Sequence, residues 1–244
     1  METPVKLKKC PIVDAIFDLQ FIPNLDANAV FGIIYSKFKD NFSKVENLPL
    51  SMTPEQIRNN DPNLKFRPLY RITNNVDPNF IIQIGPRDIT ISSSPNYIGW
   101  DNFSNNINYV VSEVLKLGII ANIVRIGIRY INFFENIDIF KGNANVEICV
   151  NKEELPYTET HLRTVFRNNK IQTILNIGNE ITLNKAGSIY QGSIIDIDTF
   201  MNTNLDNFYT DHKNIISKIH AEEKHQFFSI LSSNFIENLS PEYK

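Results

Sequence analysis

The stretch that decides the fold is residues 125–132, which read Arg125-Ile126-Gly127-Ile128-Arg129-Tyr130-Ile131-Asn132. Successive side chains of a β-strand point to opposite faces of its sheet. Two arginines and a glycine therefore share one face of this segment, and apolar or aromatic residues share the other. The pattern predicts an amphipathic strand at the centre of a sheet, with its core face formed by Ile126, Ile128 and Tyr130.

The composition is that of a folded globular protein. The chain has 244 residues, of which 42% are hydrophobic and 11% aromatic, which is ample for a packed core. A formal net charge of −3 gives no general electrostatic attraction to nucleic acid or to an anionic membrane. We expect a single α+β unit over residues 1–244, whose internal halves would be 1–120 and 121–244.

Hydrophobic periodicity outlines the expected elements. Alternation over 13–21 predicts a first strand, and apolar stripes at helical spacing predict helices near 26–41, 100–117 and 205–236. Residues 42–64 contain three prolines and predict an irregular loop. The other predicted strands are 66–73, 78–84, 87–93, 122–134, 146–151, 158–167, 170–177 and 188–199. Together these predict an antiparallel curved sheet with helices packed on one face, in two similar β-α-β-β-β-α halves.

Charged residues recur at strand spacing on four of these segments. Asp14 and Asp18 are four residues apart, so they share a face of the first strand. Arg125 and Arg129 have the same spacing, as do Arg67 and Arg71, and Asp196 and Asp198 share a face two residues apart. Where such strands are neighbours, acidic and basic rows form cross-strand ion pairs.

Two interpretations of this charged face stay open. One is a concave polar groove that binds a ligand or a peptide, because arginines on rigid strands hold carboxylates or phosphates at two points. Gly127 would then allow another group to approach the strand closely. The candidate binding residues are Arg125, Arg129, Arg67, Arg71, Asp14 and Asp18. The other interpretation is a sheet face whose charges pair with one another, each exposed pair contributing roughly 0–1 kcal/mol.

Other chemistry receives weaker support. Asp196 and Asp198 would be the carboxylates of a Mg²⁺ or Ca²⁺ site, but the sequence offers no identifiable third ligand, and no cofactor is predicted. His220 and His225 are five residues apart, a poor spacing for one helical face, and both are expected to be surface or capping residues. Cys149 lies in an apolar run and is expected to be buried.

The best local basic patch lies between residues 163 and 170. Arg163, Arg167 and Lys170 accompany Phe166 there, and a basic patch with an aromatic residue is typical of nucleic-acid binding. Three charges beside one aromatic ring are few for that function. Together with the acidic total charge, this disfavours nucleic acid as the partner.

Several segments resemble, in order along nearly the whole chain, a sporadically distributed and uncharacterised family of bacterial proteins of about this length. The segments are 11–17, 100–103, the central 125–132, 195–198 and the closing helix with His220 and Phe227-Phe228. The family has no assigned catalytic residues to transfer. Its patchy distribution resembles that of genes exchanged on mobile elements, which implies a toxin–antitoxin, conflict or phage-defence setting.

These observations lead to an expected function. We expect a non-enzymatic binding or accessory protein that acts through protein–protein interaction, with another protein or a second copy of the chain as its partner. The alternative is a small-molecule or nucleotide sensor or hydrolase that uses Asp196 and Asp198 with a divalent metal. The polar start of the chain and the lack of an apolar run long enough to span a bilayer predict a cytoplasmic protein without a membrane partner.

Overall fold

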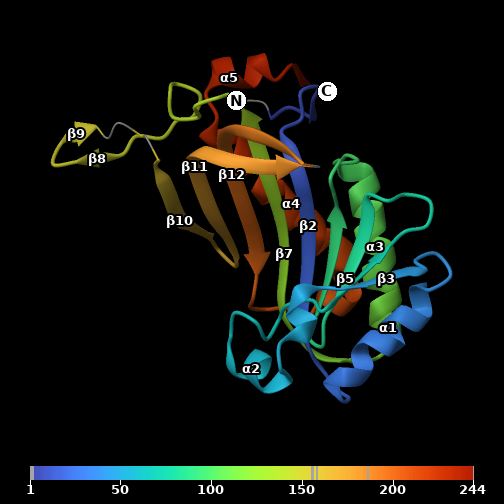
Figure 1. The fold of residues 1–244 in the computed structure, drawn as a ribbon. Helices are drawn as coiled ribbons and strands as arrows, with labels where there is room; N and C mark the ends of the chain where they lie inside the picture. The colour runs from blue at the N-terminus through green and yellow to red at the C-terminus, as the bar shows by residue number, and fades with distance from the viewer. Residues whose placement is uncertain (1–2, 155–156, 158, 186, 244) are drawn as a thin grey trace. The chain divides into compact units, whose positions relative to one another are not determined.

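The structure, a computed structural model, describes residues 3–154, 157, 159–185 and 187–243. The predicted α+β fold is confirmed: 29% of the chain is helical and 39% is strand, in antiparallel sheets with helices packed on the main sheet (Figure 1). Within the described residues the main sheet has nine strands and is not closed into a barrel. Their order is β10 (His161–Asn168), β11 (Ile171–Lys185), β12 (Ser188–Met201), β7 (Ile120–Glu135), β2 (Ile12–Pro23), β6 (Asp88–Ser93), β5 (Phe80–Ile84), β4 (Tyr70–Thr73) and β3 (Lys44–Asn47).

Shorter elements complete the fold. Two small sheets pair β1 (Lys6–Leu7) with β13 (Pro241–Glu242) and β8 (Cys149–Val150) with β9 (Glu153–Glu154). The helices are η1 (Ala27–Ala29), α1 (Val30–Phe38), η2 (Pro49–Met52), α2 (Glu55–Asn60), α3 (Trp100–Lys116), α4 (Phe208–Ile230) and α5 (Ser233–Asn238). None of the helices in the described part of the chain is long and apolar enough to cross a membrane.

The chain forms two compact units. Unit 1 consists of Met1–Val13, Arg129–Thr199 and Lys218–Lys244, and unit 2 consists of Asp14–Ile128 and Phe200–Ser217. The boundaries fall within β2, β7, β12 and α4, so each of these elements contributes residues to both units. The proposed division into similar halves at residue 120 remains a prediction.

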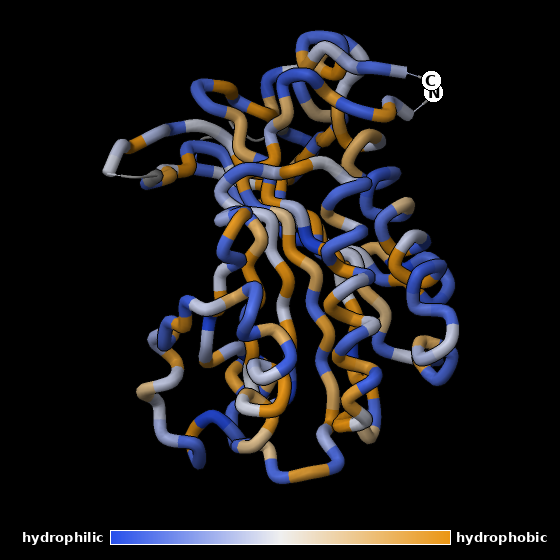
Figure 2. Tube along the Cα trace, turned by 90° about the vertical axis from the view of Figure 1, so that its right-hand side faces the viewer, coloured by the Kyte–Doolittle hydropathy of each residue, from blue (hydrophilic) through white to orange (hydrophobic). Residues whose placement is uncertain are grey.

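The core of unit 2 follows from the predicted alternation in β2 and periodicity in α3. Ala15, Phe17, Leu19 and Phe21 take every second position of β2, and all are fully buried. The apolar stripe of α3, which is Phe103, Ile107, Val110, Val111 and Val114, is fully buried as well. Figure 2 shows hydrophobic and hydrophilic residues alternating along the strands. The helix ends before Gly118, whose φ of +66° favours glycine.

The core of unit 1 is built from β7, β11, β12 and the closing helices. Its buried members from the closing helices include Phe227 of α4 and Phe235 of α5, and Leu231, which lies between the two helices, is buried with them. Ile195 and Ile197 of β12 and Leu175 and Ile177 of β11 supply the facing layer. The polar residues between them in sequence lie on the opposite face of these strands.

Some sequence predictions are wrong. Residues 42–64 are not an irregular loop, because they contain β3, η2 and α2. The strand predicted over 66–73 begins only at Tyr70, since residues 64–67 form a turn and proline follows at 68. Cys149 is exposed, because the strand predicted over 146–151 is reduced to the two residues of β8.

Candidate functional site

The candidate site is the polar face of β7, which carries Arg125, Gly127 and Arg129. Burial along the strand follows the predicted alternation, with Ile126 and Ile128 fully buried on the core face. Tyr130 completes that face at 3% exposure. The two arginines belong to different units, so the surroundings of each are described separately.

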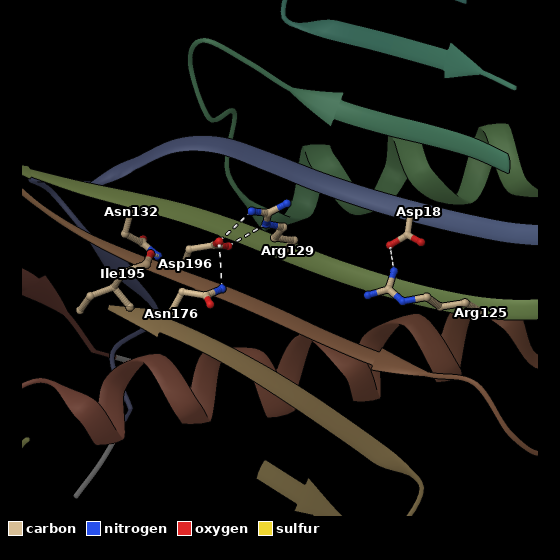
Figure 3. A network of polar contacts seen from close by, with 7 residues as sticks. All are labelled: Asp18, Arg125, Arg129, Asn132, Asn176, Ile195 and Asp196. Atoms are coloured by element: carbon tan, nitrogen blue, oxygen red, sulfur yellow. Dashed lines mark hydrogen bonds and ion pairs between the residues drawn. The ribbon is translucent and has the colours of Figure 1, made fainter. Parts of the chain in front are cut away.

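In unit 2, Arg125 forms an ion pair with Asp18 of β2 (Figure 3). Nη1 of the arginine donates to Oδ1 of the aspartate, and both side chains are only 17% exposed. The guanidinium also lies over the ring of Phe200, with Cζ 4.4 Å from the ring centroid. A cation–π contact contributes about 1 kcal/mol. Arg125 is therefore held by a charge and by an aromatic face together.

Gly127 makes room for this pair. A Cβ atom on Gly127 would lie 2.7 Å from Nη1 of Arg125 and 2.7 Å from Oδ1 of Asp18. Carbon atoms do not approach polar atoms this closely in folded proteins, so a larger residue has to displace the ion pair. The close approach expected at Gly127 is thus made by the chain's own charged groups.

A fully buried carboxyl lies on the same face of unit 2. Asp88 begins β6 opposite Gln20 of β2 and is 1% exposed. Neither of its carboxyl oxygens meets a hydrogen-bond donor in good geometry among the described residues. Burial raises the pKa of Asp88 well above its ordinary value, and the charge of Asp18 raises it further, whereas Arg67 and Thr90 lower it. The carboxyl therefore favours its neutral form at this position.

Strand register extends this face as a row of polar side chains across unit 2. The row runs Arg125, Asp18, Thr90, Gln83, Arg71 and Glu46. Its outer end is a looser ion pair, with 3.8 Å between Nη1 of Arg71 and Oε2 of Glu46 and both side chains 38% exposed. An exposed pair of this kind adds little to stability. The row in unit 2 thus has an ion pair at each end, Arg125 with Asp18 and Arg71 with Glu46.

In unit 1, Arg129 forms a two-point ion pair with Asp196 of β12 (Figure 3). Nε donates to Oδ1 and Nη2 donates to Oδ2, each over 2.7 Å. Oδ2 also accepts a hydrogen bond of 3.2 Å from Nδ2 of Asn176 on β11. The Arg129 side chain is 39% exposed, whereas that of Asp196 is 11% exposed. Arg129 is therefore rigidly held and accessible to solvent at the same time.

The row in unit 1 continues to the edge of the sheet. Asn176 pairs in register with Arg163 of β10, and β10 is the last strand of the nine. The row is therefore Arg129, Asp196, Asn176 and Arg163. Its one carboxylate is already bound by Arg129, and Arg163 forms no ion pair within the described part of the chain. This row ends in an arginine, unlike the row of unit 2, which ends in a carboxylate.

The predicted pairing of acidic and basic strands is confirmed for Arg125 and Arg129. Asp14 lies half-buried on the same face of β2 as Asp18. Arg67 does not share a strand face with Arg71, because it precedes β4, and its Nε donates to the carbonyl oxygen of Asn63 over 3.2 Å. These contacts favour the interpretation in which the charges of the face pair with one another.

Asp196 and Asp198 share the polar face of β12 without forming a ready metal site. The carboxylate oxygens of Asp196 accept hydrogen bonds from Arg129 and Asn176. A cation at this carboxylate would have to displace the arginine. In the residues that the structure describes, no three His, Cys, Asp or Glu side chains gather in a metal-binding arrangement.

The expectation that His220 lies at the surface is wrong. Its ring packs edge-on against Tyr130, with centroids 6.1 Å apart. Burial lowers the pKa of His220 to about 3, and the charge of Lys224 adds to this effect. Burial also raises the pKa of the neighbouring Glu223, which is 3% exposed, well above its ordinary value. Both groups therefore favour neutral forms in unit 1, while His225 is exposed as expected.

Sequence reasoning missed Asp88, Asn176 and Glu223. Asp88 follows a Gly-Pro-Arg sequence, where an aspartate is typical of a turn and gives no sign of burial. The burial of Glu223 could be predicted from the sequence, because the apolar residues Ile219 and Phe227 lie four residues before and after it, on the same face of the helix. Asn176 stands among apolar residues of a strand, and only the register of β11 places it beside Asp196.

No known family profile matches this chain, and no curated protein matches it at a significant level. The resemblance of the segments around residues 125–132 to a bacterial family therefore remains a prediction.

Proposed function

We propose that the protein is a non-enzymatic binding protein that acts through protein–protein interaction. The observation that carries the proposal is Arg129, which is fixed at two points on Asp196 and is still 39% exposed. A side chain that is already immobile loses little conformational freedom when a partner binds it. Asn176 and Arg163 continue the same row, so hydrogen-bond donors extend from Arg129 to the sheet edge.

The setting we propose is that of an accessory protein in the bacterial cytoplasm, encoded in a mobile-element, toxin–antitoxin or phage-defence locus. This part of the proposal rests on the resemblance of residues 125–132 and the accompanying segments. The partner is another protein, and native mass spectrometry of the purified chain separates this case from a homo-oligomer. The sensor or hydrolase alternative gains no support from Asp196, because its carboxylate is held by Arg129.

Affinity capture tests the proposal in cells that express the tagged protein together with the genes adjacent to its own. Wild type is expected to capture a specific protein, and Arg129→Ala is expected to lose it while its Tm falls by only about 2–4 °C. Lys8→Ala is the control, because Lys8 forms an exposed pair with Glu242 and should keep the capture. If wild type captures no protein, the proposed function is wrong. If Arg129→Ala still captures it, the surface is wrong.

A further inference from the structure

The edge strand β10 has the backbone geometry of a docking site. The N–H of Asn179 donates to the carbonyl of Thr160 over 3.1 Å, and β10 continues in the same register along β11. Hydrogen-bonded and non-hydrogen-bonded pairs alternate in an antiparallel ladder. Every second residue of β10 therefore turns its N–H and C=O away from β11. These residues are His161, Arg163, Val165 and Arg167, and within the described chain no further strand pairs with them.

Strand β10 and the segment of β11 paired with it are basic although the whole chain is acidic. Residues 160–179 include Arg163, Arg167 and Lys170 and no aspartate or glutamate, whereas the chain carries a net charge of −3. Arg163 and Arg167 lie on one face of β10 with Val165 between them. The edge therefore offers unpaired main-chain groups beside two charges of the same sign.

The charges decide which kind of strand fits this edge. Charged side chains commonly keep an edge strand from pairing with itself, and a second β10 would bring arginines together. An extended segment with carboxylates opposite Arg163 and Arg167 would form two favourable cross-strand pairs instead. The carboxylate opposite Arg163 would also continue the row of Arg129, Asp196, Asn176 and Arg163.

We propose that β10 binds an extended acidic segment of a partner protein, which joins the sheet as a further strand. This inference rests on the proposed function and names the place of contact within it. Main-chain hydrogen bonds supply the affinity, and side chains at alternate positions supply the specificity. On the other face of the added strand, an aromatic or β-branched residue packs against Phe166, which is 41% exposed.

The first test uses a blocked, fluorescent peptide as long as β10, with glutamates placed to face Arg163 and Arg167. Val165→Pro removes an outward N–H that the added strand needs. It leaves the ladder to β11 intact, because proline is tolerated where an edge N–H faces solvent. Fluorescence anisotropy should show binding to wild type and none to Val165→Pro. Binding retained by this variant would overturn the proposal.

The matched control is Val45→Pro on β3, the other edge strand of the sheet. The N–H of Leu48 donates to the carbonyl of Leu69 over 2.8 Å, and Val45 pairs in register with Ile72. The same alternation therefore turns the N–H of Val45 outward, and its side chain is 40% exposed. Val45→Pro should bind the peptide as wild type does. An equal loss of peptide binding in Val165→Pro and Val45→Pro would mean that proline weakens binding by disturbing the fold and not by removing an N–H at the edge of β10.

Charge reversal is the second test, and it does not depend on proline. The double variant Arg163→Glu, Arg167→Glu should bind the glutamate peptide at least about tenfold more weakly and should prefer a lysine version. Equal affinity of wild type for both peptides would overturn the proposal. A single-stranded oligonucleotide that binds wild type and Val165→Pro equally, but not the double variant, would assign the edge to nucleic acid. If Val165→Pro still captures a protein in cells, the proposed function stands and the proposed edge is wrong.

Discussion

Arg125 and Arg129 lie on the same face of β7, but they differ in solvent exposure and in the residues that hold them. Arg125 in unit 2 pairs with Asp18, both side chains are 17% exposed, and the guanidinium lies on Phe200. Arg129 in unit 1 pairs with Asp196 at two points and remains 39% exposed. Both pairs join β7 to another strand, but only that of Arg129 presents its arginine to solvent.

Both arginines form ion pairs, so it is the solvent exposure of the arginine that distinguishes a pair that stabilises the fold from a pair that can bind a partner. Removing one partner of a buried ion pair leaves an uncompensated charge, which is costly. Removing Arg129 also leaves a buried carboxylate, since Asp196 is only 11% exposed, but that carboxylate keeps its hydrogen bond from Asn176. We therefore expect Arg125 to matter for folding and Arg129 to matter for binding.

The largest expected effect separates the two arginines directly. Arg125→Leu should lower the free energy of unfolding by about 3 kcal/mol, because it leaves Asp18 buried without its arginine. Arg129→Leu should lower it by about 1 kcal/mol, because Asp196, although only 11% exposed, keeps the hydrogen bond that its carboxylate accepts from Asn176. Urea unfolding of both variants at neutral pH measures the difference.

The control is the double variant Arg125→Leu, Asp18→Leu. Replacing both partners removes the uncompensated charge, so this variant should be more stable than Arg125→Leu alone. Equal losses for Arg125→Leu and Arg129→Leu would contradict the distinction between the two pairs.

The next effect concerns the glycine that stands between the two arginines. Gly127→Ala places a methyl group 2.7 Å from both Nη1 of Arg125 and Oδ1 of Asp18, and it should cost about 2 kcal/mol. In an Arg125→Leu background one of these two polar atoms is gone and the other is no longer held in an ion pair, so the same substitution should cost less. Urea unfolding of the single and double variants gives the coupling, and additive losses would contradict this account.

The sequence was enough to predict the polar face but not its energetics. Alternation alone places Arg125, Gly127 and Arg129 opposite Ile126 and Ile128, because the period of a strand is two. It also predicts acidic partners, since rows of opposite charge stabilise neighbouring strands. Alternation does not determine which strands are neighbours, so the sequence left the particular partners open.

Other residues depended on contacts between distant segments. The burial of Asp88 comes from packing around the start of β6, and the environment of His220 comes from α4 lying against Tyr130. Both residue types are common at surfaces, so composition and spacing favoured exposure. The strand predicted over 66–73 includes Arg67, but a turn over residues 64–67 determines the conformation of this residue.

A pH experiment sharpens the comparison, because unit 2 holds the buried Asp88 near Asp18. The folded-state pKa of Asp88 is raised above the ordinary 3.8, mainly by burial. At a pH between 3.8 and the raised folded-state pKa, Asp88 is protonated in the folded chain and ionised in the unfolded chain. Over this range the free energy of unfolding therefore falls as pH rises. Asp88→Asn should remove that loss, worth about 1.4 kcal/mol for each unit of pKa difference.

The measurement is the free energy of unfolding from about pH 4 to about pH 8, a range that lies above the ordinary pKa of an aspartate. The stability of Asp88→Asn relative to wild type should increase with pH across this range. Asp40→Asn is the control, because Asp40 is exposed and its replacement should leave the profile unchanged. A wild-type profile parallel to that of Asp88→Asn would contradict the expected proton uptake.

The smallest expected effect is the response of the two ion pairs to salt. Double-mutant cycles with Arg129→Leu and Asp196→Asn, and with Arg125→Leu and Asp18→Asn, isolate the coupling energy of each pair. Raising the salt from about 0.1 M to about 1 M shortens the screening length from about 10 Å to about 3 Å. The coupling of Arg129 should fall by about 0.5 kcal/mol and that of Arg125 by less, because screening acts most on exposed charges. Equal declines would show that solvent reaches both pairs alike, and the physical reason for assigning binding to Arg129 and support to Arg125 would be lost.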